Sequence, residues 1–225
     1  MLSPVSSPSV TTADSIYHAM RDKIIAAELM PGHRLVHRQL AKEFGASNSP
    51  VLEALRRLES EGLVTSYPNA GAQVKVWQED DIVETFLARE ALEGVTCRLF
   101  VQKASPREKA KLEEFGRRFD EACSAGQYDV SFQVDIALHL YIAGEYSPAA
   151  QSASLFRLVK NSCLLTMTIR NISLAGDDGP FEIGPVGVHD ELIAALNSGD
   201  PDLAEQAGKA HVRASLEGIL QLQGQ

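Results

Sequence analysis

The sequence predicts a mostly α-helical protein that begins with a winged helix-turn-helix and continues as an all-α helical bundle. Between residues 13 and 76, two short runs with apolar residues at helical spacing meet at Gly45, and a β-prone hairpin follows them. From residue 81 onward, long segments of helical spacing alternate with turns, and none has the alternation of a strand. We therefore expect helices packed on helices in this larger part.

Length and composition are compatible with this fold class. A chain of 225 residues with 44% hydrophobic and 23% charged residues is typical of globular proteins with one or two domains. No apolar run reaches the roughly 18 residues of a membrane span, and residues 1–12 lack the basic start of a signal peptide. We expect a disordered tail over 1–12, domains over 13–76 and 81–225 with a linker at 77–80, and a cytoplasmic protein without a membrane partner.

Charge is distributed unevenly along the chain. The net charge of −9 at first argues against nucleic acid as a partner. However, residues 13–76 hold eight Lys/Arg against seven Asp/Glu, whereas residues 77–225 hold thirteen against twenty-three. The acidity belongs to the second part and does not exclude DNA binding by the first. The cysteines Cys97, Cys123 and Cys163 are widely spaced, so we expect buried thiols rather than disulfides or a zinc ribbon.

The first part is predicted to contain three helices and a hairpin. The helices are expected over residues 13–29, 36–44 and 47–61, and the strands over 63–67 and 72–76 around the turn 68–71. Two helices joined by a tight Gly turn could be an ordinary αα-hairpin. The strands that follow favour a winged helix-turn-helix, whose second helix can lie in a DNA major groove.

Several ordered motifs in this part resemble the GntR family of bacterial transcription regulators. They are Pro31-Gly32-x-x-Leu35, Arg38-x-Leu40-Ala41, Gly45-x-Ser47, Pro50-Val51, Glu53-Ala54-Leu55-Arg56-Arg57-Leu58 and Glu61-Gly62-Leu63-Val64. The resemblance implies that double-stranded DNA is a partner. The residues then expected at the DNA are Arg34, Arg38, Ser47, Asn48, Ser49, Leu52, Arg56, Asn69 and Gly71. Arg57 is expected on a solvated helix face.

This part departs from the family pattern at the recognition helix and at the wing. Asn48 and Leu52 stand where the family usually has arginines, and the wing tip reads Asn69-Ala70-Gly71 instead of Arg or Lys before Gly. Arginine neutralises phosphates and contacts guanine with two hydrogen bonds. We therefore expect lower affinity, a flatter salt dependence and different preferred bases. A regulator with weakened specific DNA binding is one alternative function.

The second part is predicted to hold five or six helices. They are expected over residues 81–102, 105–125, 128–143, 147–171, 186–196 and 201–222, with a loop at 174–185. The first of them has one apolar face, made of Val83, Leu87, Ala91, Val95 and Leu99. The second begins at a capping box, Ser105-Pro106-Arg107-Glu108.

Ionisable residues lie on apolar helix faces in this second part. Asp135 and His139 are spaced i, i+4 on the same side as apolar neighbours. Burying such a pair is costly unless something compensates it, and a metal ion held from adjacent turns can do so. One inward histidine is more often an ordinary core residue. With His189 and His211 also placed inward, a metal site is indicated.

The order of these residues resembles the FCD domain, the effector-binding domain in the FadR branch of GntR regulators. His189 precedes a helix and Gly199-Asp200, and a final histidine follows. The resemblance implies that one divalent transition metal is bound by Asp135, His139, His189 and His211. Zn²⁺ and Ni²⁺ are expected first, with Mn²⁺ or Fe²⁺ as alternatives, because the ligand set suits all four.

The resemblance also implies a small carboxylate effector at open positions of the metal. Arg89, in Arg89-x-x-Leu92-Glu93, would hold the carboxylate with two hydrogen bonds. Its alternative role is a surface or interdomain salt bridge. Arg170 and Arg157 are weaker candidates for the same effector.

The function expected from these features is ligand-responsive regulation, most commonly repression in this family, by a homodimer on an inverted-repeat operator. The alternative from another class is a metal-dependent hydrolase or lyase that uses the same site. Among carboxylates near the ligands in sequence, Asp190 and Glu191 are the candidates for a general base. An enzyme would also leave the winged helix-turn-helix unexplained.

Overall fold

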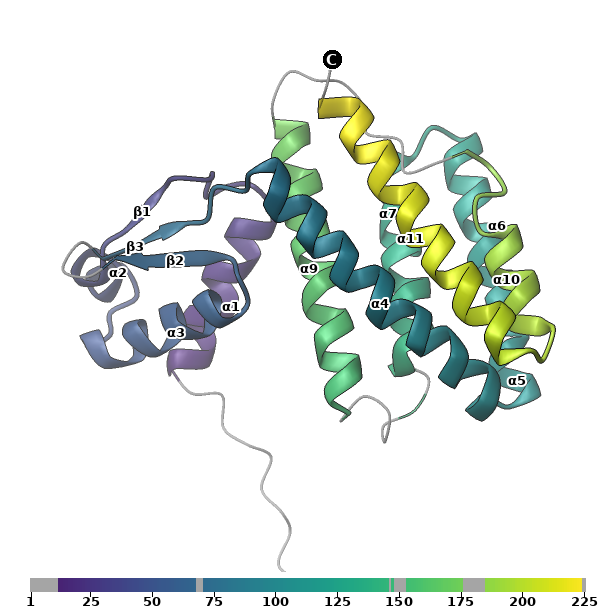
Figure 1. The fold of residues 1–225 in the computed structure, drawn as a ribbon. Coiled ribbons are helices and arrows are strands. Elements are labelled where there is room, and N and C mark those ends of the chain that lie inside the picture. Colours follow the sequence, from purple (N-terminus) through teal and green to yellow (C-terminus); the bar gives the residue numbers. More distant parts are fainter. Residues whose placement is uncertain (1–11, 68–70, 146, 148–152, 176–184, 224–225) are drawn as a thin grey trace, which may run out of the picture. The chain divides into compact units, whose positions relative to one another are not determined.

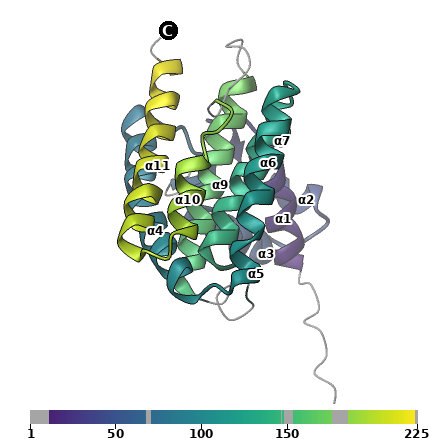
Figure 2. The same cartoon turned by 90° about the vertical axis from the view of Figure 1, so that its right-hand side faces the viewer.

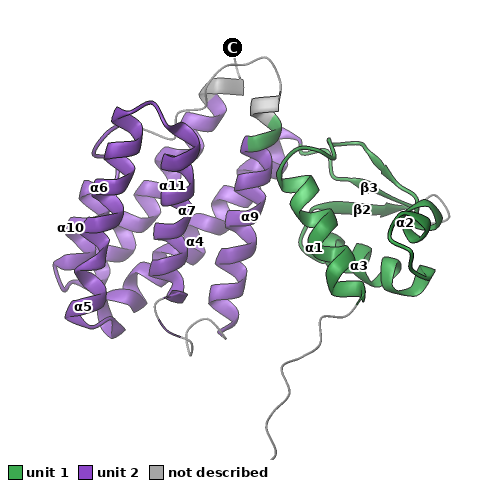
Figure 3. Cartoon of the chain, turned by 180° about the vertical axis from the view of Figure 1, so that it is seen from behind, with its two compact units in different colours: residues 1–77, 171–175 green, residues 78–170, 176–225 purple. Residues whose placement is uncertain are grey.

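The computed structural model describes residues 12–67, 71–145, 147, 153–175 and 185–223. Its many helices and one small sheet confirm the predicted fold class. The chain divides into two compact units, residues 1–77 with 171–175 and residues 78–170 with 176–225 (Figure 3). The predicted tail lies outside the described residues except for Thr12, where the first helix begins.

The first unit is a winged helix-turn-helix (Figure 1). Its elements are α1 (Thr12–Ile25), β1 (Arg34–Leu35), α2 (His37–Glu43), α3 (Asn48–Ser60), β2 (Val64–Tyr67) and β3 (Gly71–Val74). The strands form one antiparallel sheet in the order β1-β3-β2, with Leu35 paired to Ala72 and Val64 to Val74. The sequence prediction missed β1, because two residues are too few to show alternation.

Helices α1 and α3 pack through their apolar faces to form the core of this unit. The fully buried side chains are Ile16, Met20 and Ile24 of α1 and Val51, Ala54 and Leu58 of α3. Gly45, in the turn between α2 and α3, has a φ of 60°, a left-handed conformation that glycine adopts without steric cost. Helix α1 is shorter than predicted, because the amides of Glu28 and Leu29 both donate to the carbonyl of Lys23 and close the helix.

The second unit is a bundle of helices (Figures 1 and 2). Its elements are α4 (Glu79–Lys103), α5 (Pro106–Lys109), α6 (Lys111–Ser124), α7 (Tyr128–Leu140), the π-helical turn η1 (Tyr141–Glu145), α9 (Ser154–Ala175), α10 (Asp190–Asn197) and α11 (Pro201–Gln223). The last residues of α9, 171–175, belong to the first unit. Among the described residues, no helix is both long and apolar enough to cross a membrane.

The helix boundaries differ from the prediction in several places. The single helix expected over residues 105–125 is divided at Ala110 into α5 and α6. Its capping box is present, since the Ser105 amide donates to Glu108 Oε2 over 2.6 Å. The predicted start of the fourth helix falls mainly on residues 148–152, outside the described residues, and α9 begins at Ser154. Helix α10 begins at Asp190, because residues 186–189 form turns.

The apolar face predicted for α4 is largely exposed. Leu87 and Val95 expose 55% and 40% of their surface, whereas Arg89 and Glu93, on the opposite side, expose 1% and 2%. Apolar spacing could not reveal this, because the two buried charges neutralise one another as an i, i+4 ion pair. The inner face of α4 therefore carries a polar centre between Phe86 and Phe100.

Helices α4 and α11 approach each other closely where both have glycine. A β-carbon added at Gly208 would lie 2.6 Å from Cys97 Sγ, and one added at Gly94 would lie 2.8 Å from Lys209 Cγ. Both distances are too short for real side chains, so these glycines permit the packing of the two helices. This contact fixes the distance between the residues that α4 and α11 contribute to the interior.

The bundle core surrounds these interior residues. One cluster joins α4, α6, α7 and α10 through Phe100, Leu112, Leu138, Leu192 and Leu196, and a second includes Phe132 and Val159. The cysteines are free, Cys97 and Cys163 buried and Cys123 half-buried. Burial raises the pKa of both buried thiols, which keeps them protonated.

Candidate functional site

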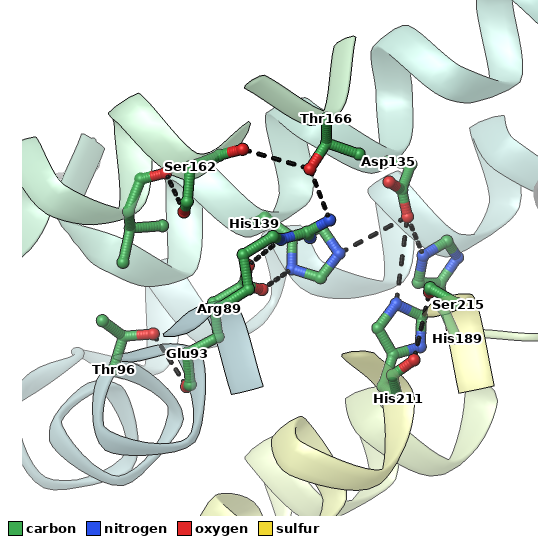
Figure 4. A network of polar contacts seen from close by, with 11 residues as sticks. Arg89, Glu93, Thr96, Asp135, His139, Ser162, Thr166, His189, His211 and Ser215 are labelled. Carbon is green, nitrogen blue, oxygen red and sulfur yellow. Dashed lines mark hydrogen bonds and ion pairs between the residues drawn. The ribbon is translucent and has the colours of Figure 1, made fainter. Parts of the chain in front are cut away.

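Four predicted metal ligands come together inside the second unit. Asp135 and His139 occupy successive turns of α7, His189 is the N-cap residue of α10, and His211 lies in the middle of α11. All four are buried. Figure 4 shows the three imidazole rings directed at the carboxylate of Asp135.

The turn before α10 positions His189. Gly187 has a φ of 85°, and its amide donates to Asp120 Oδ1 of α6 over 2.8 Å. The ring of His189 then packs edge-to-face on Phe119, with 4.4 Å between the centroids. The hydrogen bond to Asp120 and the ring contact with Phe119 therefore hold His189 in place just before α10 begins.

The ring nitrogens converge on one carboxylate oxygen. Asp135 Oδ1 lies 3.0 Å from His189 Nε2, 3.5 Å from His139 Nε2 and 3.9 Å from His211 Nε2. Asp135, His189 and His211 each offer one ligand atom, and these atoms all lie within 4.8 Å of one another. Ligands placed about 2.1 Å from a single ion are about 3 to 4 Å apart, so the spacing fits a metal centre.

Buried nitrogen atoms without partners are the second sign of a ligand site. His139 Nε2, His211 Nε2 and His189 Nδ1 have no hydrogen bond within the described part of the chain. Each unsatisfied buried polar group costs about 1–3 kcal/mol. For His139 and His211 the atom concerned faces Asp135, where an ion would satisfy it. Imidazole and carboxylate donors fit the transition metals expected from the sequence.

Opposite charges determine the ionisation of this cluster. Burial alone would raise the pKa of Asp135, but the three histidines around it, His139 foremost, hold it well below its usual value. Burial lowers the pKa of His139, yet the carboxylates of Glu93 and Asp135 outweigh this and raise it to about 9. Burial lowers the pKa of His211. The centre therefore keeps Asp135 ionised, and a metal ion bound there would displace the proton that His139 otherwise holds.

Glu93 is the neighbour that sequence reasoning did not assign a role. Its Oε2 contacts His139 Nδ1, and its Oε1 accepts a hydrogen bond from Arg89 Nε over 2.7 Å. Burial would raise the pKa of Glu93, but Arg89 and His139 lower it to about 2. The i, i+4 spacing of Arg89 and Glu93 was the only sequence signal, and it gave no information about burial.

The two arginines predicted at the effector site have different environments. Arg89 is buried and donates from Nη1 to Thr166 Oγ1 over 3.2 Å, so its alternative role as a surface salt bridge is wrong. Its Nη2 has no partner among the described residues. Arg170 is also buried, but it donates to Asp129 Oδ1 over 3.0 Å and lies over the ring of Phe132. Arg157 is exposed near the start of α9.

Seven of the predicted DNA-binding residues are exposed. They are Arg34, Arg38, Ser47, Asn48, Ser49, Leu52 and Arg56, while Gly71 is half-buried and Asn69 lies outside the described residues. Ser47 precedes α3 and makes no side-chain cap hydrogen bond. Arg57 is half-buried, donates to Asp14 Oδ1 over 2.6 Å and lies 3.9 Å from the centroid of the Tyr17 ring.

Comparisons with known proteins agree with both units. The family model for bacterial regulatory proteins of the gntR family matches residues 12–74, and that for the FCD domain matches residues 84–214. The "Probable D-xylose utilization operon transcriptional repressor" of Paenarthrobacter nicotinovorans is 31% identical over 209 residues, which cover 92% of this chain and 88% of that protein. This chain belongs to the GntR family.

More distant proteins are similar over nearly the whole chain. The HTH-type transcriptional repressor RspR of Escherichia coli is 22% identical over 215 residues, which cover 96% of this chain and 92% of that protein. The solved structure of E. coli McbR/YncC is 22% identical, with a TM-score of 0.71 over 96% of this chain and 100% of that chain. As a GntR protein with an FCD domain, the chain is a DNA-binding transcription regulator, and the hydrolase or lyase alternative is set aside.

Proposed function

We propose that this GntR regulator is a repressor that senses a small carboxylate through a metal ion in its FCD domain. Asp135, His139, His189 and His211 would hold the ion. Three imidazole nitrogens converge on one buried aspartate oxygen, and two of them have no hydrogen-bond partner among the described residues. This convergence is the observation that carries the proposal. Zn²⁺ or Ni²⁺ suits this ligand set best, and Mn²⁺ or Fe²⁺ is the alternative.

Arg89 is the residue proposed to recognise the acid. A bound metal ion would supply a positive charge and open coordination positions for a carboxylate oxygen. The Nη2 of Arg89 is a buried donor without a partner in the described residues, and a carboxylate is the acceptor that suits it best. Arg170 remains a second, weaker candidate, because it is already engaged by Asp129.

DNA binding would require two copies of the chain. A homodimer could place two α3 helices in successive major grooves of an inverted-repeat operator in the cytoplasm. The exposed line of Leu87, Ala91 and Val95 on α4 is the surface proposed for self-association. The dimer would have two arrangements of its DNA-binding units. The acid would change the affinity for the operator only if it bound one arrangement more tightly than the other. Repression is favoured because two of the relatives, from P. nicotinovorans and E. coli, are named as repressors.

The test uses the full-length protein and DNA from upstream of its own gene. Binding would be measured at two salt concentrations, with protein loaded with Zn²⁺ or Ni²⁺ and with stripped protein, in the presence of a panel of small carboxylic acids. The corresponding amides serve as controls of similar shape without charge. We expect at least one acid, and none of the amides, to weaken DNA binding only when metal is present. A panel without any metal-dependent effect would refute the proposal.

The second candidate function is a regulator with weakened specific DNA binding. It is favoured because Asn48 and Leu52 are exposed at positions where the family usually has arginine. In that case the same measurement would give similar affinity for upstream and unrelated DNA. Specific, salt-sensitive binding in the nanomolar range would exclude it.

A further inference from the structure

We infer that Glu93 is a positioning residue that fixes the metal ligand His139 and the effector arginine Arg89 with one carboxylate. The inference rests on the proposed function, because it assumes a metal at the histidines and an acid at Arg89. It concerns a residue of α4, which contributes none of the four proposed ligands.

Each carboxylate oxygen of Glu93 contacts a different residue. Oε1 accepts from Arg89 Nε over 2.7 Å, and Oε2 contacts His139 Nδ1 (Figure 4). Glu93 is 2% exposed, so water cannot replace either contact. A single side chain thus connects two groups that have different roles in the site.

The contact with His139 selects the nitrogen that faces the metal position. A neutral imidazole has one N–H donor and one acceptor nitrogen. When a metal ion displaces one ring proton of His139, the remaining proton would stay on Nδ1 beside Glu93 Oε2. The lone pair would then be on Nε2, the atom 3.5 Å from Asp135 Oδ1. Carboxylates that accept from the second nitrogen of a ligating histidine fix the ring and make it a stronger ligand.

The contact with Arg89 determines which guanidinium nitrogen remains available. Nε donates to Glu93 and Nη1 donates to Thr166 Oγ1, which leaves Nη2 unpartnered among the described residues. Two fixed hydrogen bonds hold the planar group and direct its remaining donor. Without Glu93, Arg89 would lose the carboxylate that pairs with it and the hydrogen bond that orients its guanidinium group.

Glu93→Gln is the substitution that tests this role. The amide keeps the size of the side chain but has only one acceptor oxygen, so its NH₂ group must face either His139 or Arg89. We expect metal binding about 10 to 100 times weaker than in the wild type. The matched control is Glu90→Gln on the same helix, whose carboxylate pairs with the exposed Arg213. The control should bind metal like the wild type.

The measurement is Zn²⁺ affinity of the full chain by competition with a chelator, made in the wild type and in a His139→Ala background. If Glu93 acts through His139, Glu93→Gln should weaken binding in the wild type and have little further effect when His139 is absent. A general structural defect would weaken binding equally in both backgrounds, and that result would overturn the inference.

A second variant covers the case in which Glu93→Gln does not fold. Glu93→Asp keeps the buried negative charge beside Arg89, but the shorter side chain cannot contact both partners. It should bind Zn²⁺ more weakly than the wild type, and wild-type affinity would overturn the role of Glu93 alone. A wild-type protein that takes up no metal would instead refute the proposed function, and this inference with it.

Discussion

At the scale of single residues, the interior of the second unit is organised by charges that compensate one another. Arg89, Glu93, His139 and Asp135 are buried, and each contacts an oppositely charged or ionisable neighbour. Breaking one buried ion pair by removing a partner typically costs about 3–5 kcal/mol, because the remaining charge is left uncompensated. The cluster therefore constrains the fold as well as offering a cation site.

Leu52→Arg tests the weakened DNA face. Leu52 is exposed on α3, where arginine is usual in the family. A restored phosphate contact should raise DNA affinity and steepen the slope of log K against log salt by about 0.9 for each phosphate contacted. The measurement is fluorescence anisotropy with upstream DNA between low and moderate salt. Leu203→Arg on α11 adds the same charge at another exposed leucine and is the control. An unchanged slope for Leu52→Arg would count against a role for this position at DNA.

At the scale of elements, the α4–α11 crossing holds the polar centre together. Gly208→Ala should destabilise the protein by about 1–3 kcal/mol, because the new methyl group would overlap Cys97 Sγ. Gly218→Ala on the same helix is the control, since nothing lies within 4 Å of its β-carbon position. It should be stabilising by about 0.5–1 kcal/mol, as expected for alanine in a helix. Urea unfolding measures both, and equal effects would contradict the close packing of α4 and α11.

The elements also show what sequence can and cannot predict. The order of helices and the wing followed from spacing and turn residues, and the inward histidines were found as ionisable groups on apolar faces. The buried side of α4 was not evident, because Arg89 and Glu93 are polar by type and become suitable for the interior only as a pair. Strand β1 depends on pairing with β3, and such pairing between distant segments leaves no local pattern.

At the scale of the whole molecule, the proposed dimer depends on the exposed apolar line of α4. Leu87→Glu combined with Val95→Glu should convert a dimer to monomers, because charges would be buried at the interface without partners. Light scattering measures the mass in solution. Leu158→Glu combined with Leu203→Glu, which changes two exposed leucines elsewhere, should leave the mass unchanged. A dimer that survives the α4 substitutions would place the interface on another surface.

The proposed regulation depends on Asp135, His139, His189 and His211 forming one metal centre. Calorimetric titration of the stripped full-length protein with Zn²⁺, repeated with Ni²⁺, tests it most directly. We predict saturable binding of one ion per chain, and loss of that binding when Asp135→Ala and His139→Ala are combined. Absence of saturable binding by the wild type, or equal binding by the double variant, would contradict the account.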